Sequence, residues 1–546
     1  MHRCAAAAAC LLTMLMAPPG AAAQAHDHQR AATESLGTVS FSTSCQPAVQ
    51  ADFNRAVALM HSFQFGPAID GFRGLLGRDP DCAIAYWGIA LSSWSNPFAG
   101  FKSPAQLAQG LKAVEAGRAL VPKTAREAAY LDAVAHLYVD SASIDQATRV
   151  NAYEAAMARL SAAHPDDVEA RIFDALALAA AADPADKSHA KQLKAGATLE
   201  ALFLQYPDHP GLAHYIIHAY DEPELAARAA TAARRYSGIA PSTPHALHMP
   251  SHTFTRVGDW QASIDTNAAS AASARSAGQP ADELHASDYM VYAYLQTAQD
   301  EAARQLVTAS AQAFRRFDPA QANGAAPASA AFFANAAIPA RYCLERRDWA
   351  GAMALVAQAS PFPYADAITI FTRGLGAAHL KNAAVAEQSI ADLAGIRERL
   401  KARDEGYWAD QVEIQRLEVA AQLAAVQGSR ALALATFTRA AAMEDVTELA
   451  SITPGPFVPA REMLADLLLV DADASQAAQA LAQFKASLAR HPQRFWSVYG
   501  AAQAARRAGD ASAARAYFQQ LLAIAAHADE PRRAALLAAA RAISGG

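Results

Sequence analysis

Histidine is the residue whose spacing in this chain most clearly indicates chemistry. The sequence holds 17 histidines in 546 residues, and six of them fall between positions 209 and 252. His214 and His218 stand four residues apart, which places two imidazoles on one face of a helix. A second run has offsets of three and seven, which also share a helical face, at His245, His248 and His252.

The two runs are related by a repeat. His214 to His248 and His218 to His252 are both separations of 34 residues, and His285 follows His252 after 33. We therefore expect these histidines to lie on the same face of successive repeated helices. Packed helices lie about 8–10 Å apart, so imidazoles on neighbouring helices can reach one ion.

Imidazole nitrogens are ligands of late transition metals, so the sequence predicts a site for zinc, copper or iron. The predicted ligands are His214, His218, His245, His248, His252 and His285, with Asp221 as the accompanying carboxylate. Two histidines with Asp221 or Glu222 would instead give the facial arrangement of non-haem iron. Pro250 either kinks its helix or marks the true helix start, which would leave His248 on the entering loop.

Two other interpretations of the histidines stay open. One is a groove that binds an acidic ligand or a peptide, with Arg256 and Asp288 beside the histidines. The other is a buried polar network that locks these repeats together. His61 and His136 are isolated in the sequence and are interpreted as structural, and Trp87, Trp94 and Phe98 as core residues.

Apolar residues recur throughout with a spacing near 3.6, which predicts helices rather than strands. Proline closes a helix shortly before the next one begins at Pro80, Pro165, Pro207 and Pro492. A second kind of turn carries aspartate between two helices, at Asp259, Asp300, Asp348 and Asp510. The chain is therefore predicted to be a series of helical hairpins.

These units resemble tetratricopeptide repeats of roughly 34 residues. The first unit places Ala68, Phe72 and Pro80 at the small, aromatic and proline positions of that pattern, and the last unit offers Trp496, Gly500, Ala513 and Tyr517. Tyr86-Trp87-Gly88, Pro454-Gly455-Pro456 and Pro459-Ala460-Arg461-Glu462 resemble motifs of secreted or periplasmic bacterial repeat proteins. The resemblance implies an all-α, TPR-like solenoid but no particular activity. It also implies that the histidines, if they lie on the first helices of successive repeats, face the concave surface of the stack.

The length and composition of the chain indicate its domain boundaries. A chain of 546 residues exceeds the roughly 250–300 that one core serves, so we expect two solenoid halves. The predicted boundaries are a signal peptide at 1–25, a flexible segment at 26–44, an N-terminal solenoid with the histidines at 45–316, a linker at 317–329 and a C-terminal solenoid at 330–546. A net charge of −6 gives no electrostatic footprint for nucleic acid.

The N-terminal residues are typical of a secretory signal. Arg3 precedes an apolar run too short to span a bilayer, and small residues at 23–25 offer a cleavage site. We therefore expect a periplasmic or secreted protein without a membrane span, in a compartment where disulfides form. Cys45 and Cys82 lie 37 residues apart, about one repeat, and are predicted to form a disulfide, with buried free thiols as the alternative.

The sequence carries no Gly-rich phosphate loop, Gly-x-Ser-x-Gly elbow, Cys-x-x-Cys or His-Glu-x-x-His motif. These absences disfavour a nucleotide cofactor, a common serine hydrolase, a thiol redox protein and a zincin. Two functions remain. The first is metal binding, or metal-dependent chemistry on a small substrate, at the histidines. The second is a non-enzymatic scaffold that holds a protein or peptide partner in its groove.

Overall fold

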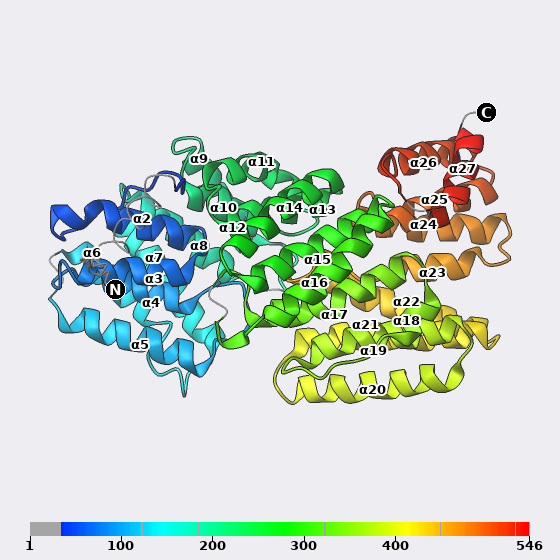
Figure 1. Cartoon of the computed structure of the whole chain (residues 1–546), viewed down its shortest axis with the longest axis horizontal. Coiled ribbons are helices and arrows are strands. Elements are labelled where there is room, and N and C mark those ends of the chain that lie inside the picture. Colours follow the sequence, from blue (N-terminus) through cyan, green and yellow to red (C-terminus); the bar gives the residue numbers. More distant parts are fainter. Residues whose placement is uncertain are drawn as a thin grey trace, which may run out of the picture. The chain divides into compact units, whose positions relative to one another are not determined.

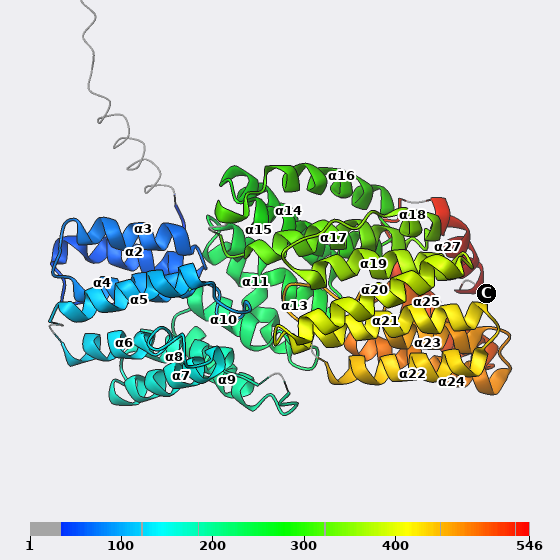
Figure 2. The same ribbon diagram turned by 90° about the horizontal axis from the view of Figure 1, so that it is seen from below.

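The computed structural model describes residues 34–121, 124–183, 185–321, 324–447, 449–529 and 531–544. Leu36–Gly546 form one compact unit, and the predicted signal peptide lies outside the described residues. Every regular element of the described residues is helical, and consecutive helices pack side by side (Figures 1 and 2).

The first half of the series runs up to the predicted linker. Its helices are α2 (Gln50–His61), α3 (Phe65–Leu76), α4 (Ala83–Trp94), α5 (Pro104–Ala119), α6 (Ala125–Ala135), α7 (Gln146–Ala163), α8 (Val168–Ala180), α9 (Ala190–Phe203), α10 (Pro210–Ala219), α11 (Ala230–Ile239), α12 (Pro244–His248), α13 (Pro250–Val257), α14 (Trp260–Ser276), α15 (Pro280–Gln296) and α16 (Asp300–Arg316). Short 3-10 turns are η1 (Pro47–Val49) and η2 (Ala226–Ala229).

The second half continues the same pattern. Its elements are η3 (Pro319–Gln321), α17 (Ala328–Glu345), α18 (Trp349–Ala354), α19 (Pro363–His379), α20 (Ala383–Lys401), α21 (Gly406–Val426), α22 (Arg430–Val446), α23 (Ala460–Leu469), α24 (Ala474–Arg490), α25 (Phe495–Arg507), α26 (Ala511–Ile524) and α27 (Pro531–Ser544). No helix among the described residues is both long and apolar enough to cross a bilayer.

Local sequence explains where the helices begin and end. The four prolines expected between helices all lie in such connections, for example Pro80 between α3 and α4. Three of the four turn aspartates, Asp259, Asp348 and Asp510, are N-caps whose side chains accept a backbone N–H of the next helix, while Asp300 is the first residue of α16. Gly258 and Gly509 take the left-handed conformation at two of these turns.

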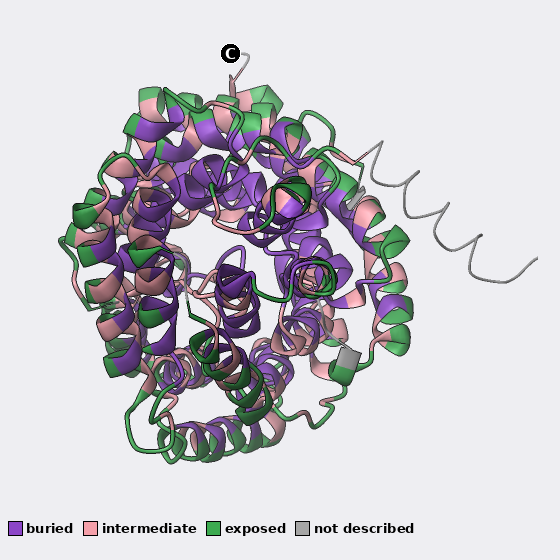
Figure 3. Cartoon of the chain, turned by 90° about the vertical axis from the view of Figure 1, so that its left-hand side faces the viewer, coloured by how far each residue is buried: buried purple, intermediate pink, exposed green. Residues whose placement is uncertain are grey.

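Small residues let neighbouring helices approach where an aromatic ring fills the gap. A methyl group added at Gly88 of α4 would lie 2.3 Å from the Phe72 ring of α3, and one at Gly500 of α25 would lie 2.2 Å from Phe484 of α24. The same small–aromatic contact thus recurs near both ends of the chain. The described chain is an all-α, TPR-like solenoid, with buried residues (purple in Figure 3) on the inner faces of its helices.

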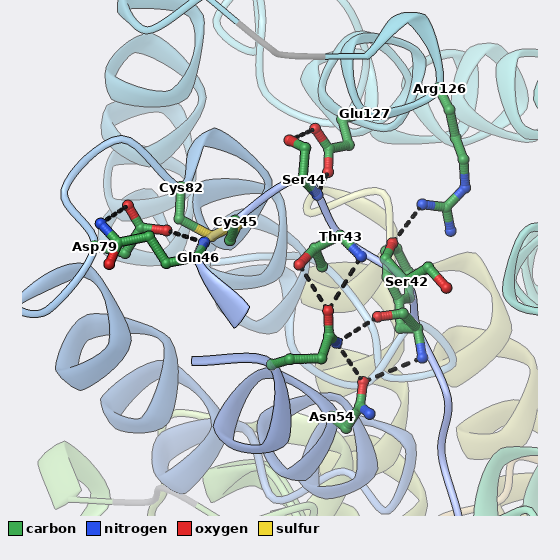
Figure 4. Close-up of a disulfide and its surroundings, with 12 residues drawn as sticks. Ser42, Thr43, Ser44, Cys45, Gln46, Asn54, Asp79, Cys82, Arg126 and Glu127 are labelled. Atoms are coloured by element: carbon green, nitrogen blue, oxygen red, sulfur yellow. Dashed lines mark hydrogen bonds between the residues drawn. A yellow bond between two sulfur atoms is a disulfide. The ribbon is translucent and has the colours of Figure 1, made fainter. Parts of the chain in front are cut away.

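The segment before α2 is packed against the first hairpins. Phe41 is fully buried, and its ring lies 5.2 Å from each of Phe53, Trp87 and Tyr130. Ser44 donates from its backbone N–H to Glu127 at 2.6 Å (Figure 4). The described part of the segment expected to be flexible, 26–44, is therefore anchored from Leu36 onward, because its apolar side chains complete the first core.

The sulfur atoms of Cys45 and Cys82 lie 1.95 Å apart, a disulfide distance, and join this segment to the start of α4 (Figure 4). The predicted partners are thus the ones that meet. Cys343 is a buried free thiol in α17. The boundary predicted at 317–329 stays a prediction, and across it α15 and α17 pack directly on one another.

Candidate metal centre

The predicted ligands lie on four neighbouring helices. His214 and His218 are on α10, His245 and His248 on α12, His252 on α13 and His285 on α15. Each of these helices begins with proline at its first position, which fixes the helix start at Pro210, Pro244, Pro250 and Pro280. Pro250 therefore marks a helix start, and His248 is the last residue of the helix before it rather than a loop residue.

The six histidines form two groups of three. His214, His218 and His245 make the first group, and within it one nitrogen from each ring lies within 4.8 Å of the others. The imidazoles of His214 and His245 face one another with their Nε2 atoms 3.0 Å apart. The Nε2 atom of His218 is buried and has no hydrogen-bond partner among the described residues.

His248, His252 and His285 make the second group, with one nitrogen from each ring again within 4.8 Å of the others. Within it, the Nε2 atoms of His248 and His252 also lie 3.0 Å apart. Both groups therefore have the same construction: two histidines four residues apart, and a third from a following helix.

The two groups adjoin one another. The ring centroids of His245 and His248 are 6.2 Å apart, and those of His218 and His252 are 6.4 Å apart. The run expected to share one helical face is thus divided, since His245 joins the first group while His248 and His252 join the second. The 34-residue repeat thus relates the pair His214 and His218 to the pair His248 and His252, but it does not relate the third histidines of the two groups.

The outer nitrogens of three of these rings are held by hydrogen-bond acceptors. His214 donates from Nδ1 to the backbone carbonyl of His61 at 2.6 Å. His252 Nδ1 lies 2.8 Å from Asp221 Oδ2, and His248 Nδ1 lies 2.7 Å from Asn267 Oδ1. Such outer partners fix the ring orientation and the tautomer of metal-binding histidines.

In the second group, these hydrogen-bond partners determine which nitrogen of His248 and of His252 carries a proton. The side-chain amide of Asn267 donates to the Ser263 carbonyl at 2.7 Å, which turns its oxygen toward His248. His248 and His252 therefore both carry a proton on Nδ1, and in the neutral form each ring presents a lone pair at Nε2. Two lone pairs 3.0 Å apart repel unless a cation lies between them.

A proton on Nε2 of His248 is disfavoured at this depth. Burial, together with His285 and His252, holds the pKa of His248 well below its ordinary value. Burial and His252 also lower the pKa of His218 and of His285 to about 3. Asp221 supplies no spare charge, because its second oxygen accepts from Arg256 Nε at 3.0 Å. Burial thus keeps His214, His218, His245, His248 and His285 as neutral imidazoles, the form that binds metal ions.

The predicted polar neighbours lie inside the protein rather than at an open groove. Burial opposes ionisation of Asp221, but Arg256 and His252 outweigh it and hold its pKa below the usual range. Arg256 is buried in this ion pair. Asp288 is fully buried and pairs with Arg341 Nε at 2.8 Å. In the structure, Asp221 thus pairs with His252, whereas Asp288 pairs with Arg341.

A third histidine group lies beside the first and is built differently. Glu169 accepts from His61 Nε2 at 2.9 Å and from His209 Nε2 at 3.0 Å. His61 Nδ1 lies 3.0 Å from the Tyr215 hydroxyl. A carboxylate between two N–H donors needs no metal ion, so this group is a polar support under α10. That His61 is structural stays a prediction; its carbonyl also accepts the Nδ1–H of His214.

Aromatic rings surround the first group. Phe98 stacks on His218 at 4.3 Å, and Phe63 stacks on His245 at 5.2 Å and meets His214 edge-on at 4.3 Å. Phe63 and Tyr215 also line an apolar pocket of about 500 Å³ that extends away from the histidines. Tyr289 stacks on His252 in the second group at 4.8 Å.

Several residues that contact the histidine ligands could not be recognised from the sequence. Asn267 and Tyr289 lie outside the histidine runs, and a backbone carbonyl such as that of His61 leaves no trace in residue identity. Phe98 was expected in the core, but it is half-buried and stacks on a predicted ligand. A turn of helix separates Tyr289 from His285, which is the one signal that could have indicated its place.

Comparisons with known proteins give only remote likenesses. No family model and no curated protein matches the chain. A crystal structure of the APC/C hetero-tetramer Cut9-Hcn1 has a TM-score of 0.35 and 11% identity, covering 95% of this chain and 81% of the other. A human IFIT1 dimer with m7Gppp-AAAA has a TM-score of 0.35 and 10% identity, covering 81% and 90%. At these scores the likenesses support no statement about function.

Proposed function

We propose that the chain binds two transition-metal ions, one in each three-histidine group. The observation that carries this proposal is the 3.0 Å approach of the Nε2 atoms of His248 and His252, with both Nδ1 protons committed to other acceptors. A cation between the two nitrogens removes the repulsion. The orphaned Nε2 of His218 supports the same conclusion for the first group.

The donor set favours zinc or copper. Tetrahedral zinc with Zn–N bonds of about 2.0–2.1 Å separates two ligand nitrogens by about 3.3 Å. The 3.0 Å pairs in both groups need only a small opening to reach that spacing. Iron sites with two histidines use a carboxylate as well, and both oxygens of Asp221 already accept hydrogen bonds. In place of a ligand role, we propose that Asp221 orients His252.

Three nitrogens leave a fourth metal position for water or substrate. A site of this kind can supply Lewis-acid chemistry or an activated water when its metal is bound. The apolar pocket beside Phe63 supports a small apolar substrate near the first group. With cobalt in place of the native metal, 4-phenylimidazole should perturb the visible spectrum more strongly than imidazole does. An unchanged spectrum with both compounds would remove the small-substrate proposal.

Metal analysis of untagged protein tests the binding proposal. We expect two equivalents of zinc or copper per chain, and the loss of one equivalent in either His218→Ala or His252→Ala. His136→Ala, an exposed histidine outside both groups, is the matched control and should keep both equivalents. A metal-free protein that takes up neither zinc nor copper at neutral pH contradicts the proposal.

The same variants separate metal binding from the two alternatives. A network that only locks the repeats predicts no metal but a large loss of stability in His252→Ala. A scaffold for a protein or peptide partner, which the helical-repeat fold also fits, predicts no metal and little change in stability. The proposed function requires metal loss in both variants.

We also propose a periplasmic or secreted location. The Cys45–Cys82 disulfide supports it, because structural disulfides persist in oxidising compartments. Cell fractionation with a periplasmic marker tests this location. Recovery of the chain in the cytoplasmic fraction, with both thiols reduced, would contradict it.

A further inference from the structure

A second pocket lies in the C-terminal half of the chain, apart from the histidines. It is formed by α19, α21, α22 and the segment that follows α22, and it holds about 570 Å³ of empty space. Six aromatic side chains contribute to its wall, namely Phe333, Tyr364, Phe371, Tyr407, Trp408 and Phe457. No part of the proposed metal centre contributes to this wall.

The aromatic rings of this wall support one another. Trp408 stacks on Tyr364 with ring centroids 4.1 Å apart, and Tyr407 meets Trp408 edge-on at 4.8 Å. Phe457 lies 6.3 Å from both Phe333 and Phe371. Rings fixed in this way present π-electron density to the pocket at little entropic cost.

Two carboxyl groups line the same pocket. Glu418 of α21 is only 2% exposed, and within the part of the chain that the structure describes no hydrogen bond or ion pair holds its carboxyl. Glu444 of α22 accepts one backbone N–H, from Ala460, at 2.9 Å. The oxygen of Gln415, also in the wall, is buried without a hydrogen-bond partner. A buried carboxyl without a partner is costly unless a ligand supplies one.

The cationic side chains nearby have partners of their own. Arg341 pairs with Asp288, and Arg494 pairs with Glu345 and Glu462. Arg490 donates to the backbone carbonyls of Asp445 and Thr447. None of these contacts is made to Glu418 or Glu444.

The pKa values of Glu418 and Glu444 are raised, as expected for two buried carboxyl groups that lie close together. Burial, together with Glu444, raises the pKa of Glu418 well above its ordinary value. Burial raises the pKa of Glu444 to about 7, with Asp445 adding to the rise while the Ala460 N–H, Arg490 and Arg494 oppose it. At neutral pH the pair thus retains at least one proton that an incoming positive charge would displace.

We propose that this pocket binds an organic cation, an alkylammonium or quaternary ammonium group, against its aromatic wall and the Glu418–Glu444 pair. Aromatic rings attract such cations through their π-electron density, and a carboxylate adds direct charge pairing. The site is independent of the metal centre, so neither proposal depends on the other. A carbohydrate is the competing ligand for an aromatic pocket with two carboxyls, and it has a distinct outcome below.

Calorimetric titration of the full chain with choline and with its neutral isostere 3,3-dimethylbutan-1-ol tests the proposal. We expect choline to bind about tenfold more tightly than the neutral alcohol, as a desolvated cation–π contact of about 1–2 kcal/mol requires. The apparent enthalpy should change with the ionisation enthalpy of the buffer, because binding displaces a proton. Equal affinity for the two compounds, no binding of choline, or tighter binding of glucose than of choline would overturn the proposal.

Variants complete the test. Glu418→Gln keeps the shape of the side chain and removes a buried carboxyl, so it should fold at least as well as the parent and bind choline about tenfold more weakly. Asp410→Asn removes a charge from an exposed position of the same helix and should bind like the parent. A Glu418→Gln protein that melts as a folded chain and binds choline unchanged contradicts the assignment of this pocket.

Discussion

Two neighbouring histidine clusters in this protein contain similar residues but differ in how their imidazole nitrogens are hydrogen-bonded. In the His61–Glu169–His209 cluster, a carboxylate lies between two imidazoles and accepts an N–H from each. In the group of His248, His252 and His285, two facing nitrogens lie 3.0 Å apart, and the outer nitrogen of each of these two rings donates to another acceptor. In the first arrangement each facing nitrogen is paired with Glu169, although His209 Nδ1 has no hydrogen-bond partner among the described residues; for the second we propose a cation between the nitrogens. The number of histidines alone does not distinguish a structural polar cluster from a metal site. The hydrogen bonds made by the outer ring nitrogens distinguish the two.

The largest expected effect of this difference is on stability when metal is removed. Binding to the native state alone contributes about 4 kcal/mol per site at a free metal concentration a thousandfold above Kd. We expect chelation to lower the free energy of unfolding of the parent by about this amount for each ion released. Denaturant unfolding with and without chelator measures it. Identical unfolding curves would mean that the two three-histidine groups are as self-sufficient as the Glu169 cluster.

Glu169→Gln should produce the next largest effect, on stability alone. The substitution removes a buried charge that two histidines share, at a cost of about 3–5 kcal/mol. Metal content should stay at two equivalents, because Glu169 contacts neither group of three directly. The control is Glu200→Gln, at an ion pair near the surface with Arg228, where a loss of about 0–1 kcal/mol is expected. Loss of metal in Glu169→Gln at full stability would reverse the roles assigned to the two clusters.

Asn267→Ala tests whether the outer hydrogen bond matters to the second group. Removing such a partner lowers metal affinity by about 10–100-fold. We expect this loss at one site only, since Asn267 orients His248 and has no contact with the first group. Competition with a chromogenic chelator resolves the two affinities, and Thr266→Ala on the same helix serves as the control. Equal weakening of both sites would show that the groups act as one cluster.

The smallest effect is a change in the pH dependence of the chelated protein. The folded-state pKa of His218, about 3, lies below its ordinary value, so the unfolded chain binds a proton first as pH falls below about 6.5. Each such histidine removes up to about 1.4 kcal/mol of stability per pH unit in that range. His218→Ala should therefore have a shallower decline between about pH 6.5 and pH 5 than His136→Ala. Parallel declines would show that His218 is not buried in its neutral form.

The repeat architecture was accessible from the sequence because it is encoded locally. Prolines, turn aspartates and small–aromatic pairs such as Gly500 and Phe484 each act within one hairpin, so their spacing predicts the helices. The 34-residue separation correctly indicated that the pairs at 214/218 and 248/252 have equivalent places. Local patterns could not predict that His245 leaves its own run to join the preceding pair, since that depends on how α12 packs between α10 and α15.

Polar contacts over long sequence distances were beyond the reach of those patterns. The His61 carbonyl meets His214 across 153 residues, and Glu169 meets His61 across 108. The depth of burial was also hidden, and it moved Arg256 and Asp288 from an expected groove into internal ion pairs. Glu418 and Glu444 gave no signal either, because isolated glutamates on helices are ordinarily solvent-exposed.

The most direct test of the central claim is anomalous diffraction at the zinc and copper absorption edges, from crystals of the untagged, metal-loaded protein. The account predicts two anomalous peaks, each within about 2.0–2.1 Å of three histidine nitrogens, one in the group of His214, His218 and His245 and one in the group of His248, His252 and His285. A peak at Glu169 between His61 and His209, or no peak in either group of three, would contradict it.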